Sequence, residues 1–553
     1  MPSSWRPADK QFSQLQPRRA RRIELRRVIL AMVAAASVLA VVGASGTAGA
    51  STNGNITGPP GLSNTVNTIE NLPLYRHSDW GISVLDEKSG QAVVTQNAQK
   101  MFDPGSTMKL YSVSTALRLY GPNYQFKTPV YREGTVAGDT LNGNLVLVAS
   151  GDMSLGLREQ PNGTLYYESL PKIDQSYADI GVPGDYVEPP GNPLAGLDQL
   201  AAMVRASGIT QVNGNVVIDD RLFTAYSGFP DGLIAPIWVN ENLIDVVVTP
   251  STVGQTASIN WRPMTASYTV ESQVSTVAAG QSTSVMITEP TPGNLVVTGQ
   301  IAAGTTPTLV VREVDDPSAF ARTAFIQALQ SAGVSVSAPA TGPNPEALLP
   351  PKGSYQPSDM IGEHVSAKLS QFSNLILKTS YNRGADLMVC LSAVRAGSTS
   401  CPQGLVPEVK TITGLGVPST SVFPFDGAGS DDQGRTTAAA IATFLRRATT
   451  TSYGPTLYNS LPDFDRSGTI AGVLPKSPAA GHAQVKTGNR IVQTPANQIL
   501  VLGNSLAGYI HTKSGRHLTF MIVVGNVPIS SPQEFETITR QQAQMVAAIR
   551  QDM

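Results

Sequence analysis

The sequence predicts a mixed α/β fold in which the two ends of the chain form one domain around a large β-rich insertion. A hairpin-like pair of strands at residues 80–95 leads into a helical run. Further strand-like segments and a closing helix follow residue 483. Between these ends, residues 125–355 contain short apolar segments separated by Gly, Asn and Pro turns. We therefore expect one domain over 73–124 and 356–553, and one or more inserted modules over 125–355.

The composition is that of an ordinary folded protein and excludes several functions. The chain has 553 residues, of which 41% are apolar and 14% charged, with a formal net charge of −1. It has no basic stripe interleaved with aromatic residues, which argues against a nucleic-acid partner. No Walker loop, dinucleotide fingerprint or His-Glu-x-x-His motif occurs, so we expect neither a cofactor nor a metal.

Residues 1–50 have the layout of a signal peptide. Several arginines between Arg18 and Arg27 precede an uncharged apolar run from Val28 to Val42. Because a run of about 15 residues is short for a membrane-spanning helix, we favour cleavage after Ala50 over an uncleaved anchor. The protein is expected to be exported, and to contact a membrane only if this segment is retained. Residues 51–72 are rich in Gly, Asn, Ser and Thr, and we expect them to form a flexible linker.

Two cysteines, Cys390 and Cys401, are the only ones in the chain. In an oxidising compartment, two cysteines this close in sequence favour a local disulfide over two free thiols. The absence of nearby histidines argues against a metal site at this pair.

The first chemically suggestive motif is Ser106-x-x-Lys109, at the start of an apolar-periodic run. A spacing of three residues places the hydroxyl and the amine on one helical face, as a nucleophile beside its base. The N-terminus of a helix also favours a developing oxyanion. A second match, Ser169 to Lys172, contains Pro171, which argues against a continuous helix there.

Two downstream motifs supply the remaining groups that acyl transfer needs. Ser380-Tyr381-Asn382 follows a helical run, and its hydroxyl and amide can relay a proton and orient Lys109. Lys486-Thr487-Gly488 ends an apolar strand, where the glycine allows a substrate backbone to approach the strand edge. Lys88-Ser89-Gly90 and Lys513-Ser514-Gly515 share the third pattern, but both lie in expected turns that explain their composition.

Together these motifs resemble those of the penicillin-interacting serine enzymes. The long β-rich separation between Ser106 and Ser380 resembles the low-molecular-mass class C penicillin-binding proteins, the D-alanyl-D-alanine carboxypeptidase/endopeptidase family. The segments Gly151 to Leu155 and Val239 to Asn242 also resemble this family. The resemblance implies a penicillin-binding, β-lactamase-like transpeptidase domain with a large insertion between its first and second catalytic motifs.

The resemblance also implies a mechanism on peptidoglycan stem peptides. Ser106 attacks the carbonyl of the penultimate D-alanine, and Lys109 takes its proton. Ser380 and Lys486 pass a proton to the leaving D-alanine, while Asn382 holds Lys109 and the substrate amide. No cofactor takes part, and β-lactam antibiotics acylate the same serine. The implied location is the periplasm, or the cell wall and extracellular face of the cytoplasmic membrane.

Further residues of the site follow from the same resemblance. Thr487 meets the terminal carboxylate beside Gly488, and the backbone N–H groups of Ser106 and Asn489 hold the oxyanion. Asp231 lies where the family can place a carboxylate that contacts the amine of the stem-peptide side chain. An ordinary loop aspartate explains Asp231 equally simply, and we favour that interpretation.

The sequence departs from the family pattern in places, including the second and third motifs, and several functions stay open at this stage. Tyr381 and Asn489 occupy positions where the family often has an acidic or amide residue and a small hydroxyl residue, respectively. A β-lactamase or an esterase can use the same motifs. A non-catalytic penicillin-sensing or wall-binding protein can keep the fold. The choice between carboxypeptidase and endopeptidase activity also stays open.

Overall fold

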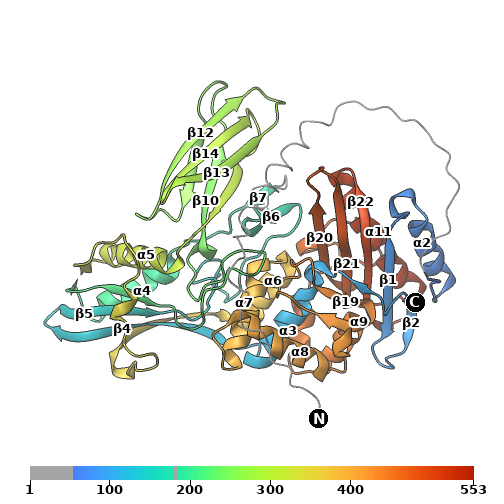
Figure 1. The fold of residues 1–553 in the computed structure, drawn as a ribbon, viewed down its shortest axis with the longest axis horizontal. Helices are drawn as coiled ribbons and strands as arrows, with labels where there is room; N and C mark the ends of the chain where they lie inside the picture. The colour runs from blue at the N-terminus through green and yellow to red at the C-terminus, as the bar shows by residue number, and fades with distance from the viewer. Residues whose placement is uncertain (1–53, 179–184) are drawn as a thin grey trace, which may run out of the picture.

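The computed structural model describes residues 54–178 and 185–553 (Figure 1). The expected signal peptide, residues 1–50, lies outside this part of the chain. No helix within the described ranges is both long and apolar enough to cross a membrane.

The two ends of the chain meet in one five-stranded antiparallel sheet, at the right of Figure 1. The strand order is β2 (Ala92–Gln96), β1 (Asp79–Asp86), β22 (His517–Ile529), β21 (Ile499–His511) and β20 (Ala483–Gln493). The register between β1 and β22 pairs Asp79 with Gly525 and Asp86 with Leu518. This pairing joins the first and last strands of the chain, and it confirms the expected mixed α/β architecture.

Alternation along β22 determines which helices cover each face of this sheet. Phe520 and Ile522 share an apolar cluster with α11 (Pro532–Asp552), whereas Met521 and Val523 pack with α9 (Ala438–Ala448) and the helices beyond it. Both faces are therefore buried, which explains the almost continuous apolar sequence of this strand.

The expected flexible linker over residues 51–72 is wrong for the part that the structure describes. Pro60–Glu70 form helix α2, which packs against α11. Leu62, Val66 and Ile69 recur at helical spacing and are buried in the same cluster as α11. The helix is stabilised by this tertiary contact, since its polar residues alone give it little helical propensity.

A group of helices lies beside the sheet and carries the first two motifs. These are α3 (Lys109–Tyr120), α6 (Leu369–Thr379), α7 (Asn382–Arg395), α8 (Leu405–Gly414) and α10 (Gly454–Ser460). Cys390 in α7 forms a disulfide with Cys401 in the turn before α8. Three short strands, β3 (Met101–Phe102), β18 (Val422–Phe423) and β19 (Arg435–Thr437), form a small sheet next to these helices.

The insertion is built on a second sheet covered by two helices, at the left of Figure 1. Its strands are β4 (Gln125–Ala137), β5 (Thr140–Val148), β8 (Gln211–Val212), β9 (Val216–Asp219), β16 (Ser335–Val336) and β17 (Met360–Lys368), and its helices are α4 (Ala195–Ala206) and α5 (Pro317–Ser331). Because β17 pairs with β4, the insertion continues to Lys368 and does not end at residue 355.

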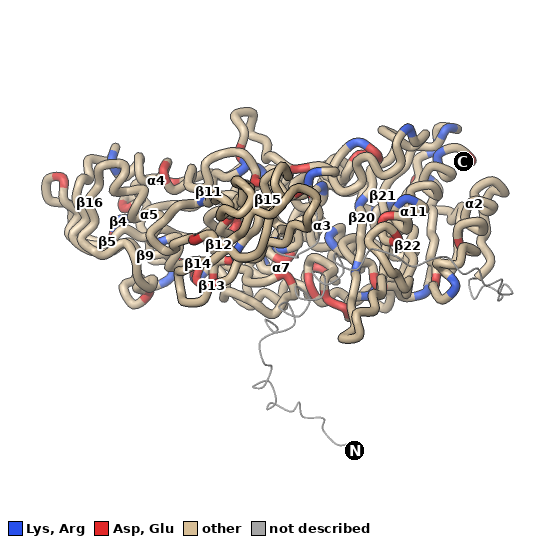
Figure 2. The backbone as a smooth tube through the Cα atoms, turned by 90° about the horizontal axis from the view of Figure 1, so that it is seen from above, with Lys and Arg blue, Asp and Glu red and all other residues tan. Residues whose placement is uncertain are grey.

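The rest of the insertion forms an arm that projects from the molecule in Figure 1. It contains one three-stranded sheet of β10 (Leu243–Thr249), β11 (Ser258–Arg262) and β15 (Thr308–Glu313), and a second of β12 (Thr269–Val277), β13 (Ser284–Thr291) and β14 (Asn294–Ala302). Two short strands, β6 (Lys172–Asp174) and β7 (Asp185–Val187), pair nearby. Viewed from above in Figure 2, acidic and basic residues are scattered along the elongated molecule.

Candidate active site

Ser106 lies in a tight 3₁₀ turn, Gly105–Met108, that leads directly into α3. Gly105 has a φ of +52°, a left-handed conformation that favours glycine. Its N–H donates to Oδ1 of Asp103 at 3.0 Å. Burial raises the pKa of the Asp103 carboxyl to about 7 despite this hydrogen bond and the nearby Arg435. The turn therefore presents Ser106 at the start of the helix, as the sequence predicts.

Two glycines allow strand β20 to lie directly against this turn. A Cβ added to Gly488 would come within 2.3 Å of the Pro104 carbonyl oxygen, and one on Gly105 within 2.4 Å of the Asn489 nitrogen. These distances are too short for any side chain. The backbone that approaches Gly488 is therefore the protein's own Pro104 turn, whereas the sequence predicts a substrate backbone there, and the contact brings the Asn489 backbone next to the Ser106 turn.

Lys109 is completely buried and its amine is held by three oxygen atoms. Nζ lies 2.7 Å from Oγ of Ser106, 2.6 Å from Oδ1 of Asn382 and 2.9 Å from the Ala428 carbonyl oxygen. Burial lowers the pKa of Lys109 to about 8, although the negative charge of Asp231 and neighbouring carboxylates opposes the shift. A lysine with this pKa is a free base far more often near neutral pH than an ordinary lysine, and a general base requires the free amine.

The Ala428 carbonyl is positioned by the glycine-rich loop Asp426 to Ser430. The Asp426 carboxylate accepts hydrogen bonds from the N–H groups of Gly429, Ser430 and Asp431 at 2.6, 2.9 and 2.7 Å. Burial raises the pKa of Asp426 to about 6 in spite of these donors. The loop therefore closes one side of the Lys109 pocket with a fixed backbone.

Ser380 and Lys486 form a second hydroxyl–amine pair. Nζ of Lys486 donates to Oγ of Ser380 at 2.9 Å and to the Thr487 carbonyl at 2.7 Å. Burial, and then the charge of Lys109, hold the pKa of Lys486 well below its usual value. Ser380 has a left-handed φ of +64° at the end of α6, an uncommon conformation for serine that directs the chain into α7.

Asn382 connects Lys109 to groups contributed by the insertion. Its Nδ2 donates to Oδ1 of Asp231 at 2.8 Å, so Asp231 lies within the site. The hydroxyl of Tyr177 donates to the Ser380 carbonyl and lies 3.3 Å from Oδ1 of Asn382. The second motif is therefore held in part by loops of the insertion.

Of the predicted substrate-binding residues, Thr487, Gly488 and Asn489 lie along β20, the edge strand of the main sheet. Oγ1 of Thr487 lies 2.7 Å from Oγ1 of Thr469, which fixes its orientation. The Asn489 side chain is exposed. An edge strand offers free backbone groups to an extended peptide, which can add to the sheet as a further strand.

Sequence reasoning missed two groups of the site. Tyr177 lies in an irregular stretch with no motif around it. Asp386 lies one helical turn after Asn382 on α7, accepts a hydrogen bond from the Gly427 N–H at 2.9 Å and is fully buried. Burial and the neighbouring Asp426 hold its pKa well above the usual range. A carboxyl four residues from Asn382, on the same helical face, is the sequence signal that could have identified it.

Comparisons with known proteins agree with this geometry. A sequence model of the D-Ala-D-Ala carboxypeptidase 3 (S13) family matches residues 62–549. The chain belongs to this S13 family. A D-alanyl-D-alanine carboxypeptidase of Actinomadura sp. (strain R39) is 25% identical over 486 residues, which cover 84% of this chain and 80% of the relative.

Solved structures of penicillin binding protein 4 from Haemophilus influenzae share the fold of this S13 protein. One has a TM-score of 0.66 at 16% identity and covers 88% of this chain and 99% of its own. A second, complexed with a β-lactam, has a TM-score of 0.62 at 17% identity and the same coverage. The expected penicillin-binding fold and family are therefore confirmed.

Proposed function

We propose that this S13 protein is an exported serine DD-peptidase that cleaves the D-Ala-D-Ala end of peptidoglycan stem peptides through an acyl-enzyme on Ser106. The observation that carries the proposal is the 2.7 Å contact between Oγ of Ser106 and Nζ of Lys109, whose pKa burial lowers to about 8. A serine becomes an effective nucleophile when a free-base amine lies within hydrogen-bond reach. The signal-like residues 1–50 support export to the periplasm or cell wall.

In the acylation step, Oγ of Ser106 forms a bond to the carbonyl carbon of the penultimate D-alanine while its proton moves to Nζ of Lys109. The carbonyl oxygen becomes an oxyanion beside the N–H groups of Ser106 and Asn489. The C–N bond then breaks, and the amine of the terminal D-alanine receives a proton through the hydroxyl of Ser380, which Lys486 contacts at 2.9 Å. Water then hydrolyses the ester and restores Ser106.

The groups around β20 suit a substrate that ends in a carboxylate. Thr487 and Lys486 offer a hydroxyl and an amine to it, and β20, as an edge strand, offers its backbone groups to the peptide. Asp231 holds Asn382 through Oδ1, while its buried Oδ2 makes no hydrogen bond. This second oxygen is free to accept a hydrogen bond from an amine on the stem peptide. Both D-Ala-D-Ala carboxypeptidase and endopeptidase substrates meet these requirements.

We also propose that β-lactams acylate Ser106 and leave it slowly. The β-lactam complex of the Haemophilus influenzae protein, which shares this fold, supports the proposal.

The test is the intact mass of residues 51–553 after incubation with benzylpenicillin. Wild type and Ser89→Ala, which changes the serine of a turn with a similar motif, should gain the mass of the whole drug. Ser106→Ala should gain none.

Each other outcome of this experiment identifies a different function. Unchanged drug without an adduct on wild type would favour the non-catalytic penicillin-sensing or wall-binding protein. Drug that is consumed without an adduct would indicate a β-lactamase. An adduct that persists in Ser106→Ala would assign the nucleophile to another residue.

A further inference from the structure

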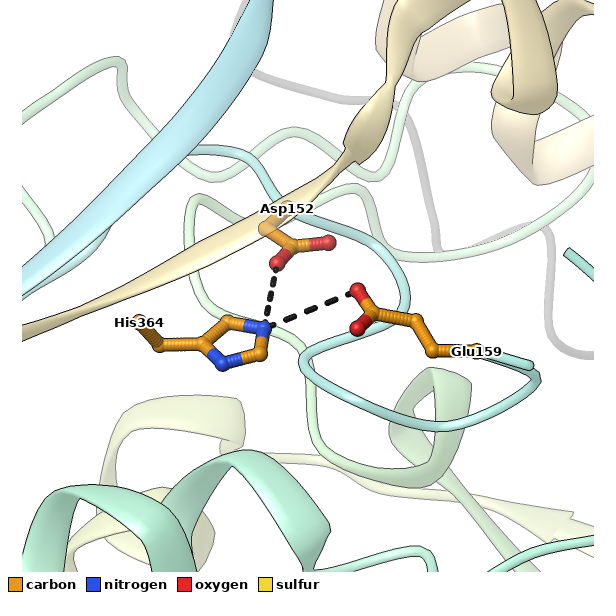
Figure 3. Close-up of side chains that lie close together, drawn as sticks. All are labelled: Asp152, Glu159 and His364. Carbon is orange, nitrogen blue, oxygen red and sulfur yellow. Dashed lines mark ion pairs between the residues drawn. The ribbon is translucent and has the colours of Figure 1, made fainter. Parts of the chain in front are cut away.

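Three potential metal ligands converge within the insertion, between the loop that follows β5 and strand β17. Asp152 and Glu159 come from the loop that follows β5, and His364 comes from β17 (Figure 3). Nε2 of His364 lies 3.5 Å from Oδ2 of Asp152 and 3.7 Å from Oε1 of Glu159. One ligand atom from each residue lies within 4.8 Å of the other two.

Two of these atoms are buried without a hydrogen bond. Oδ2 of Asp152 and Nε2 of His364 have no hydrogen-bond partner, although the residues are only 3% and 4% exposed. A charge-assisted N–H···O bond would be about 2.7–2.9 Å long, well below the observed 3.5 and 3.7 Å. Ligands about 2.0–2.2 Å from a tetrahedral metal ion lie roughly 3.2–3.6 Å from one another. The 3.5 Å separation lies within this range and the 3.7 Å separation just above it, so a shared cation can take the place of the direct ion pairs with little movement.

The surrounding groups orient all three side chains for this role. Nδ1 of His364 lies 2.6 Å from Oε1 of Gln199, so Nδ1–H donates to this amide oxygen and Nε2 faces the carboxylates. Oδ1 of Asp152 accepts from the N–H and hydroxyl of Ser154 at 2.9 and 2.8 Å. Oε1 of Glu159 accepts from the Ala367 N–H at 3.1 Å. Such outer contacts to His and carboxylate ligands are typical of metal sites.

We propose that Asp152, Glu159 and His364 bind one Zn²⁺ ion, which ties the loop after β5 to strand β17 within the insertion. One imidazole and two carboxylates form a donor set that zinc accepts, with water completing the coordination. The Glu159 side chain is 27% exposed, which gives the ion and this water a route in. Because β17 leads directly into α6, which ends beside Ser380, the ion would stiffen the support of the second motif.

A proton on His364 competes with Zn²⁺ for this cluster. Burial lowers the pKa of His364, but the nearby carboxylates of Asp152 and Glu159 outweigh this effect and raise the pKa to about 9. In metal-free protein at neutral pH, the imidazole is therefore protonated. Zinc has to displace this proton, and the experiment must distinguish the two occupants.

The test is equilibrium zinc binding to the purified protein after dialysis against a chelator, read by metal analysis and titration calorimetry at pH 7.5. Wild type should bind one equivalent of Zn²⁺, and its melting temperature should rise with the logarithm of free zinc. Asp152→Asn and His364→Gln should weaken binding at least about 100-fold, since even outer-sphere changes cost 10–100-fold. Glu363→Gln, which changes the ion-pair partner of Lys127 next to His364, should bind like wild type.

A spectroscopic measurement keeps the proposal testable if a variant fails to fold. Co²⁺ added to the wild type should develop the visible absorption of a four- or five-coordinate site, and Zn²⁺ should remove it. Absence of one tightly bound equivalent, an unchanged Co²⁺ spectrum, or equal zinc binding by folded His364→Gln would each overturn the proposal. The first two results would leave the proton as the occupant. None of these readouts depends on peptidase activity.

Discussion

The Lys109 amine lies among the carboxylates of Asp231, Asp386 and Asp426, whose charges oppose the effect of burial on its pKa. If Lys109 is the general base, acylation by a β-lactam should rise with pH up to about 8 and then level off. Asp231→Asn removes one of these negative charges and so stabilises the free base. We expect the midpoint of the rise to move down by about one pH unit.

The measurement is the second-order rate constant for acylation by a chromogenic β-lactam between pH 5.5 and 9.5. Asp198→Asn, on α4 of the insertion, serves as the control because its carboxylate is at the surface, where it accepts a hydrogen bond from Asn192 at 2.7 Å. Its midpoint should equal that of wild type. An unchanged or raised midpoint in Asp231→Asn would show that this carboxylate does not act on the base.

Tyr177 is a positioning residue of the second motif, because its hydroxyl donates to the carbonyl of Ser380, which has a left-handed backbone. Tyr177→Phe removes one hydrogen bond, so we expect acylation to slow by about 3- to 30-fold, which corresponds to roughly 0.7–2 kcal/mol. Tyr166→Phe removes a hydroxyl that contacts Glu168 in the same irregular stretch and should keep the full rate. Equal acylation rates for both variants would show that the Tyr177 hydroxyl does not help to position Ser380.

Residues of the site differ in how far the sequence could reveal them. Ser106 and Lys109 are three residues apart on one helix, so local geometry alone brings them together. Tyr177 reaches Ser380 from a distant irregular loop, held through Arg158, whose guanidinium binds Asp174 at 2.8 and 2.9 Å just before the Tyr177 turn. No periodicity or motif encodes such a contact, because it depends on the packing of the whole insertion.

Strand β20 reaches the Ser106 turn only because Gly488 has no side chain. In Gly488→Ala, the new Cβ would meet the Pro104 oxygen at 2.3 Å, so the strand must move away from Ser106. A displacement of about 1 Å costs roughly 100-fold in rate, and we expect acylation to fall by at least this factor. Gly414→Ala on α8, where nothing lies within 4 Å, should keep the rate and gain up to about 1 kcal/mol of stability. A Gly488→Ala variant with the wild-type rate would show that the close contact between β20 and the Ser106 turn is not needed for acylation.

Composition alone predicts a flexible linker over residues 51–72, whereas Pro60–Glu70 form helix α2. Its composition signals flexibility, whereas three buried apolar residues at helical spacing attach it to α11. Leu62→Ala should lower the free energy of unfolding by about 2–5 kcal/mol, as measured by urea denaturation. Asn67→Ala, on the exposed face of the helix, should change it by less than about 0.5 kcal/mol. Similar small effects for both would mean that α2 is only loosely attached.

At the scale of the molecule, the sequence predicts that the two ends of the chain form one domain, but it does not predict the residue at which the insertion ends. The strand patterns at both ends are strongly apolar, and their pairing in one sheet follows from the need to bury them. The end of the insertion depends on β17 pairing with β4, more than two hundred residues earlier in the chain. Phe126, Met153 and Trp238 of the insertion also join the core around α3 and α6, so composition alone could not separate the two parts.

Several buried carboxyl groups should make the stability of the whole molecule fall as pH rises. Burial raises the pKa of Glu70 to about 7, of Asp103 to about 7 and of Asp426 to about 6. These groups titrate near pH 4 in the unfolded chain. The folded state therefore binds more protons between about pH 4 and 7, and its extra stability is lost as the pH rises through this window. We expect the free energy of unfolding to be a few kcal/mol lower at pH 8 than at pH 5.

Glu70 offers a direct check, because its carboxylate accepts a hydrogen bond from Gln96 at 2.9 Å and an amide can replace it. Glu70→Gln removes one titrating group, so the loss of stability between pH 5 and pH 8 should shrink by up to about 3 kcal/mol. Glu346→Gln, at an exposed carboxyl, should leave the loss unchanged. Urea unfolding at both pH values measures the difference. If stability instead rose from pH 5 to pH 8, these carboxyls would have to be ionised in the folded protein, with partners that offset their burial.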